Sequence, residues 1–243
     1  MSEFKFPTEE VDLPSKGLIY PKDNPLSSGK VEMKYMTAKE EDILSNQSYI
    51  QKGTVLDKLL QSLIITKFDY NDLLVGDKNG LMVASRILGY GKDYTFKYQG
   101  EEHTVDLSLI EAKPVAEVVT QATTNEFNFK LPSSGVDVTF KLLTSKDESA
   151  VSSELEGLKK LSPNSPPPEL STRIKHFITS VNGERDKKAI RQFVDNYLLA
   201  TDSRALRKYL VEITPDVDLT FFPEQSEEKV SIPIGLKFFW PDF

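Results

Sequence analysis

Cysteine is absent from the 243-residue chain, which excludes disulfide bonds, thiolate catalysis and cysteine-based zinc sites together. Histidine occurs only twice, so few ligands are present for a transition metal. No stretch approaches the ~20 consecutive apolar residues that a membrane-spanning helix needs. The first residues lack the basic segment and apolar run of a secretory signal. These absences predict a soluble protein that remains in the cytoplasm where it is made.

Motifs for catalysis or nucleotide binding are missing as well. The chain has no G-x-S-x-G nucleophile motif, no P-loop and no dinucleotide-binding glycine motif. Neighbouring carboxylates occur at residues 40–42 and 147–148, but they fall in the first turn of predicted helices, where the helix dipole favours negative charge. His103 and His176 are predicted to be solvated or boundary residues. We therefore predict no catalytic residue, no metal site, no cofactor and no enzymatic activity.

The overall charge argues against a nucleic-acid partner. Acidic residues outnumber basic ones by 37 to 30, for a formal net charge of -7, which supplies no global attraction for phosphates. Basic residues cluster locally at 185–188 and 204–208, but acidic residues interleave with them at helical spacing, which predicts solvated helix faces. Hydrophobic residues make up 39% of the chain, enough for the core of one large domain or two small ones.

Short motifs recur in the same order in the two halves of the chain. The matching segments are Pro14–Gly17 and Pro132–Gly135, Val31–Tyr35 and Val136–Phe140, Thr37–Glu41 and Thr144–Glu148, and finally Asp77 and Asp202. The extra residues of the second copy are assigned to a proline-rich insertion near 162–168. Proline lacks the backbone N–H and clashes with the preceding turn, so this segment cannot be part of an ordinary helix. The ordered matches favour an internal duplication. The alternative is that similar strand-then-helix units select similar turn and cap residues.

Each copy predicts an α+β lobe with a β-rich opening, several helices and a closing β-hairpin. The predicted features are capping boxes at Thr37–Glu40 and Thr144–Asp147, helices over 54–66 and 169–181, further helices capped by Asp77 and Asp202, and hairpins over 94–107 and 218–234. The first lobe is expected over 1–112 and the second over 127–243, with 113–126 as a linker. The proline-rich insertion is interpreted as a bare linker rather than a presented polyproline segment.

Four aromatic residues crowd the last six positions of the chain: Phe238, Phe239, Trp240 and Phe243. Either this segment folds back onto its own lobe, or it docks into a partner, where aromatic rings supply large contact area. These four residues are our candidates for partner contact. If the segment docks outward, removing residues 240–243 should abolish partner binding and leave the fold intact, whereas unfolding would place it in the core.

The ordered motifs carry a family resemblance. The order of Leu13–Gly17 with Tyr20-Pro21, Val31–Glu41, Leu131–Gly135 with Phe140–Thr144, and the terminal Phe238–Pro241 resembles the T4-type phage baseplate hub assembly proteins. The resemblance extends from about residue 11 to residue 243 and lies in the ordered set rather than in any single motif.

The resemblance implies a non-enzymatic assembly factor or scaffold that binds the hub proteins of a phage tail baseplate. Its partners would be other baseplate hub proteins, with no small-molecule substrate and no membrane. It would act in the host cytoplasm during assembly. One alternative is a permanent structural component of the virion tail baseplate. A second alternative, from another functional class, is a host-directed or nucleic-acid-handling phage protein. The sequence leaves the hub subunit and the oligomeric state open.

Overall fold

The computed structural model describes residues 7–223 and 229–239. Within these ranges, helices are combined with small sheets whose strands pair antiparallel throughout. The α+β class predicted from the sequence is therefore confirmed. Two of the four candidate contact residues, Trp240 and Phe243, lie outside the described residues.

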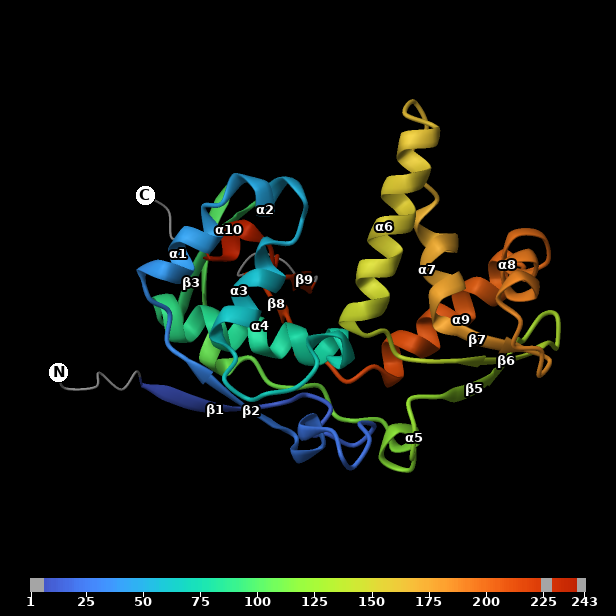
Figure 1. The fold of residues 1–243 in the computed structure, drawn as a ribbon, viewed down its shortest axis with the longest axis horizontal. Helices are drawn as coiled ribbons and strands as arrows, with labels where there is room; N and C mark the ends of the chain where they lie inside the picture. Colours follow the sequence, from blue (N-terminus) through green and yellow to red (C-terminus); the bar gives the residue numbers. More distant parts are fainter. Residues whose placement is uncertain (1–6, 224–228, 240–243) are drawn as a thin grey trace.

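The first half contains two hairpins that flank a set of helices (Figure 1). In chain order its elements are β1 Thr8–Asp12, η1 Pro25–Ser28, β2 Lys30–Lys34, α1 Ala38–Leu44, α2 Gln47–Gln51, α3 Val55–Leu63, η2 Tyr70–Asp72, α4 Val75–Tyr90, β3 Asp93–Tyr98, β4 Glu101–Asp106 and η3 Leu107–Leu109. Strand β1 pairs with β2, and β3 pairs with β4.

A short connecting segment and the second half follow. Their elements are α5 Glu117–Thr120, β5 Phe127–Lys130, β6 Asp137–Phe140, α6 Ser145–Leu161, α7 Glu169–Phe177, β7 Ile178–Val181, α8 Lys187–Asn196, α9 Ala200–Ile213, β8 Thr220–Phe221, β9 Val230–Ser231 and α10 Leu236–Phe239. Strands β5, β6 and β7 form one sheet, and α6 projects from it with the exposed proline-rich insertion at its tip (Figure 1).

Both predicted capping boxes are present at the starts of α1 and α6. The backbone N–H of Thr37 donates to the Glu40 carboxylate at 3.0 Å, and that of Thr144 donates to Asp147 at 3.1 Å. Each carboxylate also accepts a hydrogen bond from a lysine six residues upstream. A cap formed within four residues depends only on local spacing, which is why the sequence predicts it well.

The predicted N-caps of the next helices are wrong. The N-cap of α4 is Leu74 and that of α9 is Leu199, so both aspartates lie inside the first helical turn. Asp77 instead accepts hydrogen bonds from Ser15, and Asp202 accepts them from the backbone of Ser133 and Ser134. The carboxylates therefore anchor the two Pro-Ser turns rather than their own helices.

Two predicted helices end earlier than expected. Helix α3 stops at Leu63, and Ile64 then forms a bridge with Met33 of β2. Helix α7 stops at Phe177, and the following residues, predicted as helix, form β7 against β6. The β-branched residues of this segment favour strand, and the ladder to β6 satisfies their backbone groups.

The last elements of the chain pack on the first half. Phe221 of β8 contacts Phe96 of β3 with ring centroids 5.0 Å apart, and Phe238 of α10 contacts Tyr94 at 4.8 Å. Figure 1 shows β8, β9 and α10 beside α3 and α4, away from α6 to α9. The packing thus crosses the boundary drawn for a second lobe over 127–243. Corresponding hydrogen bonds recur in the two halves, and their origin by duplication stays a prediction.

The segment predicted as a linker, residues 113–126, is packed and hydrogen-bonded. Val119 of α5 is fully buried. The side-chain amide of Asn125 donates to the carbonyl of Leu142 and accepts from its N–H, each at 2.8 Å. Further backbone hydrogen bonds join Val75 to Leu143, and one buried hydrophobic cluster includes residues from both halves. The halves therefore share a continuous core.

Candidate functional site

The two described members of the C-terminal aromatic candidates, Phe238 and Phe239, are buried. Phe238 is 1% exposed and Phe239 is fully buried, and their rings meet edge-on with centroids 5.4 Å apart. In this arrangement neither ring is accessible to a partner, as expected if the segment folds back onto the chain. Trp240 and Phe243 lie outside the described residues, and partner binding by the four side chains stays a prediction.

The histidines lie at the boundary between core and surface. His103 on β4 is half-buried and lies beside Phe221, with ring centroids 5.5 Å apart. His176 on α7 lies 3.0 Å from the carboxylate of Glu154. Arg191 donates two hydrogen bonds of 2.6 Å to the same carboxylate. This cluster could not be predicted from the sequence, because its members come from three helices.

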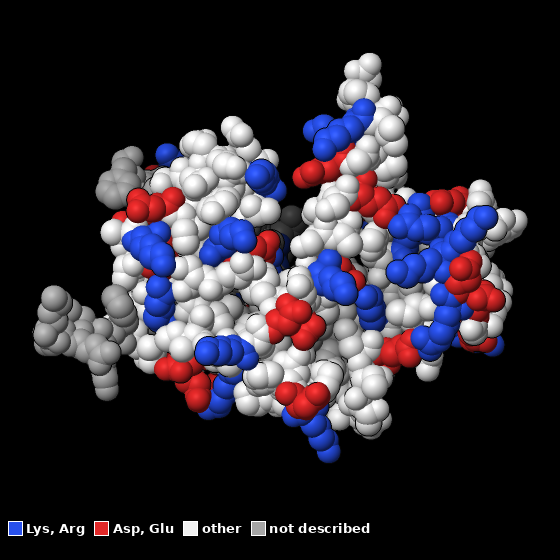
Figure 2. Space-filling model, viewed as in Figure 1, with Lys and Arg blue, Asp and Glu red and all other residues white. Residues whose placement is uncertain are grey.

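Basic residues gather on the second half around a cavity of about 330 Å³ beside α7 and α8. Figure 2 shows blue side chains over this region with red ones among them. The ion pairs here are Lys141 with Asp147, Lys175 with Asp195, Arg185 with Glu126 and Arg191 with Glu154. Because most of the positive charge is paired with carboxylates, the cavity offers little net attraction for an anionic ligand.

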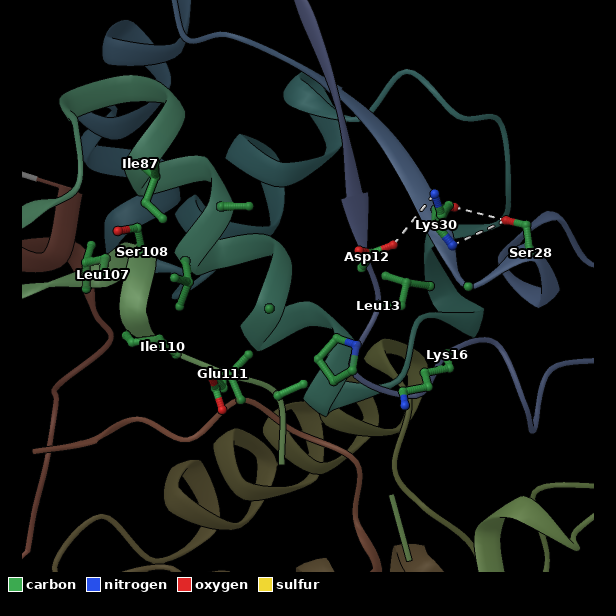
Figure 3. A pocket seen from close by; sticks show the side chains of 17 residues that line it. Asp12, Leu13, Lys16, Ser28, Lys30, Ile87, Leu107, Ser108, Ile110 and Glu111 are labelled. Carbon is green, nitrogen blue, oxygen red and sulfur yellow. Dashed lines mark hydrogen bonds and ion pairs between the residues drawn. The ribbon is translucent and has the colours of Figure 1, made fainter. Parts of the chain in front are cut away.

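A larger groove lies on the first half, against α4. Its volume is about 690 Å³, within the range of sites that bury a ligand or a partner's side chains. We call it the α4 groove, and it is lined by Asp12, Leu13, Pro14, Lys16, Ser28, Gly29, Lys30, Gly80, Val83, Ala84, Ile87, Leu107, Ser108, Ile110, Glu111, Ala112 and Val217. In Figure 3, Ile87, Leu107 and Ile110 lie on one side, and Asp12, Lys30 and Ser28 on the other.

Close backbone packing forms the base of the α4 groove. Gly80 of α4 faces the ring of Pro14, and a Cβ on residue 80 would lie 2.9 Å from a ring carbon. The N–H of Leu13 donates to the carbonyl of Gly29 at 2.8 Å, which holds the two sides of the β1–β2 connection together. Gly29 has a φ of 74°, a conformation that glycine adopts without strain. The absence of a side chain at residue 80 lets the turn lie directly on the helix.

A buried carboxylate holds the turn beside the groove in place. Asp77 accepts hydrogen bonds from the N–H of Ser15 at 2.8 Å, from its hydroxyl at 2.7 Å and from the hydroxyl of Tyr20 at 2.7 Å. The Tyr20 oxygen in turn accepts from the N–H of Leu74 at 2.9 Å. Burial raises the pKa of Asp77 and, together with that carboxylate, the pKa of Tyr20. These bonds tie the turn to the start of α4 and make this side of the groove rigid.

The groove combines an apolar interior with a charged rim. Leu13, Val83 and Leu107 belong to the buried core, and other apolar side chains line the opening. Asp12 and Lys30 form an ion pair of 3.9 Å at one edge, and Glu111 lies across from them (Figure 3). This arrangement is suited to burying apolar side chains while polar contacts form around them.

A metal-binding cluster and a membrane-spanning helix are both absent from the described part of the chain. It contains no group of three or more His, Asp or Glu side chains placed to hold a metal ion. No helix in it is both long and apolar enough to cross a bilayer. The expectations of no metal and no cofactor stay predictions.

Comparison of the chain with protein-family models, with curated proteins and with solved structures gives no match in any of the three.

Proposed function

We propose that this chain is a non-enzymatic assembly factor for the tail baseplate hub of a phage and that it binds hub subunits through the α4 groove. The observation that supports a binding function most strongly is the groove itself, an open apolar surface framed by charges. Surfaces of this kind on folded proteins serve contacts with other proteins.

The rigidity of the groove also favours binding of a partner. Its walls come from the β1–β2 connection, α4, residues 107–112 and Val217, and they are joined by backbone hydrogen bonds and the Asp77 network. A surface that is already ordered before binding loses little conformational entropy when a partner docks.

The resemblance of the ordered motifs to phage baseplate hub assembly proteins supports the choice of partner. On this proposal the protein acts in the host cytoplasm while the hub is built, and its partners are other hub proteins. A permanent place in the virion baseplate is the second candidate. It predicts a fixed stoichiometry of this chain in purified particles, whereas an assembly factor would be absent from them.

The decisive experiment is co-expression with candidate hub subunits, followed by size-exclusion chromatography with light scattering. Ala84→Trp fills the groove and should abolish the complex. Leu161→Trp is the matched control, because it adds the same side chain at a residue of α6 that is 82% exposed and lies outside the groove. Hub subunits that assemble unaided while the wild-type chain elutes alone would contradict the proposal.

A nucleic-acid-handling function remains a rival from another class. It predicts DNA binding that weakens steeply with salt concentration. The pairing of the second-half basic residues with carboxylates supports it less than the groove supports protein binding.

A further inference from the structure

Strand β1 has one paired edge and one open edge. The N–H of Tyr35 donates to the carbonyl of Pro7, and the N–H of Leu13 donates to that of Gly29. Antiparallel ladders alternate, so the odd residues 7, 9, 11 and 13 exchange hydrogen bonds with β2. The N–H and C=O groups of Thr8, Glu10 and Asp12 therefore point away from β2. Within the described residues, no other backbone group pairs with them.

The open edge of β1 leads into the α4 groove. Asp12, the last residue of the strand, lines the groove. Figure 3 shows β1 ending at Asp12 between Lys30 of β2 and the wall formed by α4 and residues 107–110. A strand added along this edge would lie about 4.8 Å from β1, and its course would continue into the groove.

The two faces of such a strand would meet different surroundings. Thr8, Glu10 and Asp12 are exposed on the outer face, where the two carboxylates share one cation, Lys30 of β2, so net negative charge remains. On the opposite face, Val11 is partly buried against the core and Glu9 is exposed. Side chains of an added strand would therefore alternate between the acidic outer face and an inner face that is apolar at Val11 and in the groove beyond Asp12.

Charge decides between the possible occupants of the edge. A second copy of β1 would place Glu9, Glu10 and Asp12 against the same acidic residues, and like charges across a strand pair are destabilising. An extended segment with alternating basic and apolar residues matches both faces. Its basic residues would lie beside Glu10 and Asp12, and its apolar residues would enter the groove.

We infer that the α4 groove and the open edge of β1 form one docking site for an extended segment of a partner protein with alternating basic and apolar side chains, bound as a third strand. This mode of recognition draws affinity from main-chain hydrogen bonds and specificity from alternate side chains. The inference deepens the proposed protein-binding function and rests on it.

The probe for this site is a labelled seven-residue peptide of alternating lysine and valine, titrated against the full-length protein by fluorescence anisotropy. A peptide of alternating glutamate and valine should bind at least about tenfold more weakly. Binding of the lysine peptide should slow hydrogen exchange at the N–H groups of Glu10 and Asp12. Equal binding of the two peptides, or no added protection at these amides, would overturn the inference.

Two substitutions at one position separate charge from hydrogen bonding. Glu10→Gln removes the charge and keeps the outward N–H, whereas Glu10→Pro removes both. Proline is tolerated on a free strand edge, where its missing N–H takes no part in the ladder. Glu10→Pro should bind the lysine peptide about five- to tenfold more weakly than Glu10→Gln. Equal affinities would show that the peptide does not add to the sheet.

A second proline variant, Thr8→Pro, tests the same point if the Glu10→Pro protein does not fold. Thr8→Pro removes an outward N–H at the first strand residue with no change in charge, and it should also weaken binding of the lysine peptide. Unchanged binding by a folded Thr8→Pro protein would count against strand addition. A dimer of the protein alone that Glu10→Pro abolishes would identify a second copy as the occupant and overturn the inference.

The inference and the proposed function fail in different ways. Hub subunits that bind Glu10→Pro as tightly as Glu10→Gln would overturn strand docking and leave the proposed function standing. A wild-type protein that binds the lysine peptide but no hub subunit would contradict the proposed function alone.

Discussion

Gly76 lies so close to the carbonyl oxygen of Pro215 that a Cβ atom on residue 76 would be 1.8 Å from that oxygen. The contact joins α4 of the first half to the chain that follows α9. Beside it, the N–H of Val75 donates to the carbonyl of Leu143 at 3.0 Å. Glycine at this position is what lets the two halves approach at the backbone.

Gly76→Ala should therefore lower the free energy of unfolding by about 2–4 kcal/mol, because backbone must move to admit the methyl group. Gly157→Ala on α6 is the matched control, since a Cβ there meets no atom within 4 Å. That change should raise stability by about 0.5–1 kcal/mol through better helix propensity. Urea unfolding followed by circular dichroism measures both, and equal effects of the two changes would contradict the close contact.

Tyr20→Phe tests the network that fixes the turn beside the α4 groove. The change removes a donor to buried Asp77 and the acceptor for the N–H of Leu74. It should destabilise the protein by about 2–3 kcal/mol, since buried polar groups lose their partners. Tyr35→Phe removes only a solvent-exposed hydrogen bond to Glu9 and should change stability by less than about 0.5 kcal/mol. Similar losses from both changes would argue against a structural role of the Asp77 network.

Stability should fall in acid through Glu40. Burial alone would raise the pKa of this carboxyl, but hydrogen bonds from Lys34, Ser62 and Thr37 outweigh it and lower the pKa to about 2. The folded pKa lies below the ordinary value of 4.5, so the stabilisation is complete above about pH 4.5 and is lost as the pH falls toward 2.

Glu40→Gln should therefore be less stable than the wild type at pH 7, by on the order of 1–2 kcal/mol once solvent screening is allowed for. The gap should shrink between pH 4.5 and pH 2. Urea unfolding at a series of pH values measures it, with the exposed Glu32→Gln as control. A gap of the same size at pH 2.5 and pH 7 would contradict the lowered pKa.

Phe238→Ala should show that the C-terminal helix belongs to the core. Its ring is 1% exposed and contacts Tyr94, so truncation should cost about 3–5 kcal/mol of stability. Phe222→Ala is the control, because that ring is 61% exposed and its loss should cost less than about 1 kcal/mol. A thermal unfolding series measures both, and a Phe238→Ala protein as stable as Phe222→Ala would refute core packing of α10.

Local features of this fold were predictable from the sequence, and contacts between distant segments were not. The capping boxes at Thr37 and Thr144 need only four neighbouring residues. The bonds from Asp77 to Ser15 span 62 positions, and nothing in the local sequence distinguishes that carboxylate from an N-cap. Strand β1 was missed because Glu and Asp have low strand propensity, and pairing with β2 overrides it.

The α4 groove could not be predicted from the sequence for the same reason. The α4 groove takes its walls from separate segments of the chain, and none of them carries a recognisable motif. The aromatic residues at 238–243 were visible in the sequence, but the packing of Phe238 depends on Tyr94 in the other half.

The return of the last elements onto the first half has a consequence for synthesis. Tyr94 and Phe96 are covered by Phe238 and Phe221, which the ribosome adds only after α9. The first half therefore leaves the ribosome with part of its aromatic core uncovered. Contacts so distant in sequence slow folding and leave apolar surface open to aggregation meanwhile. The first half therefore cannot complete its aromatic core until residues 220–239 have been synthesised.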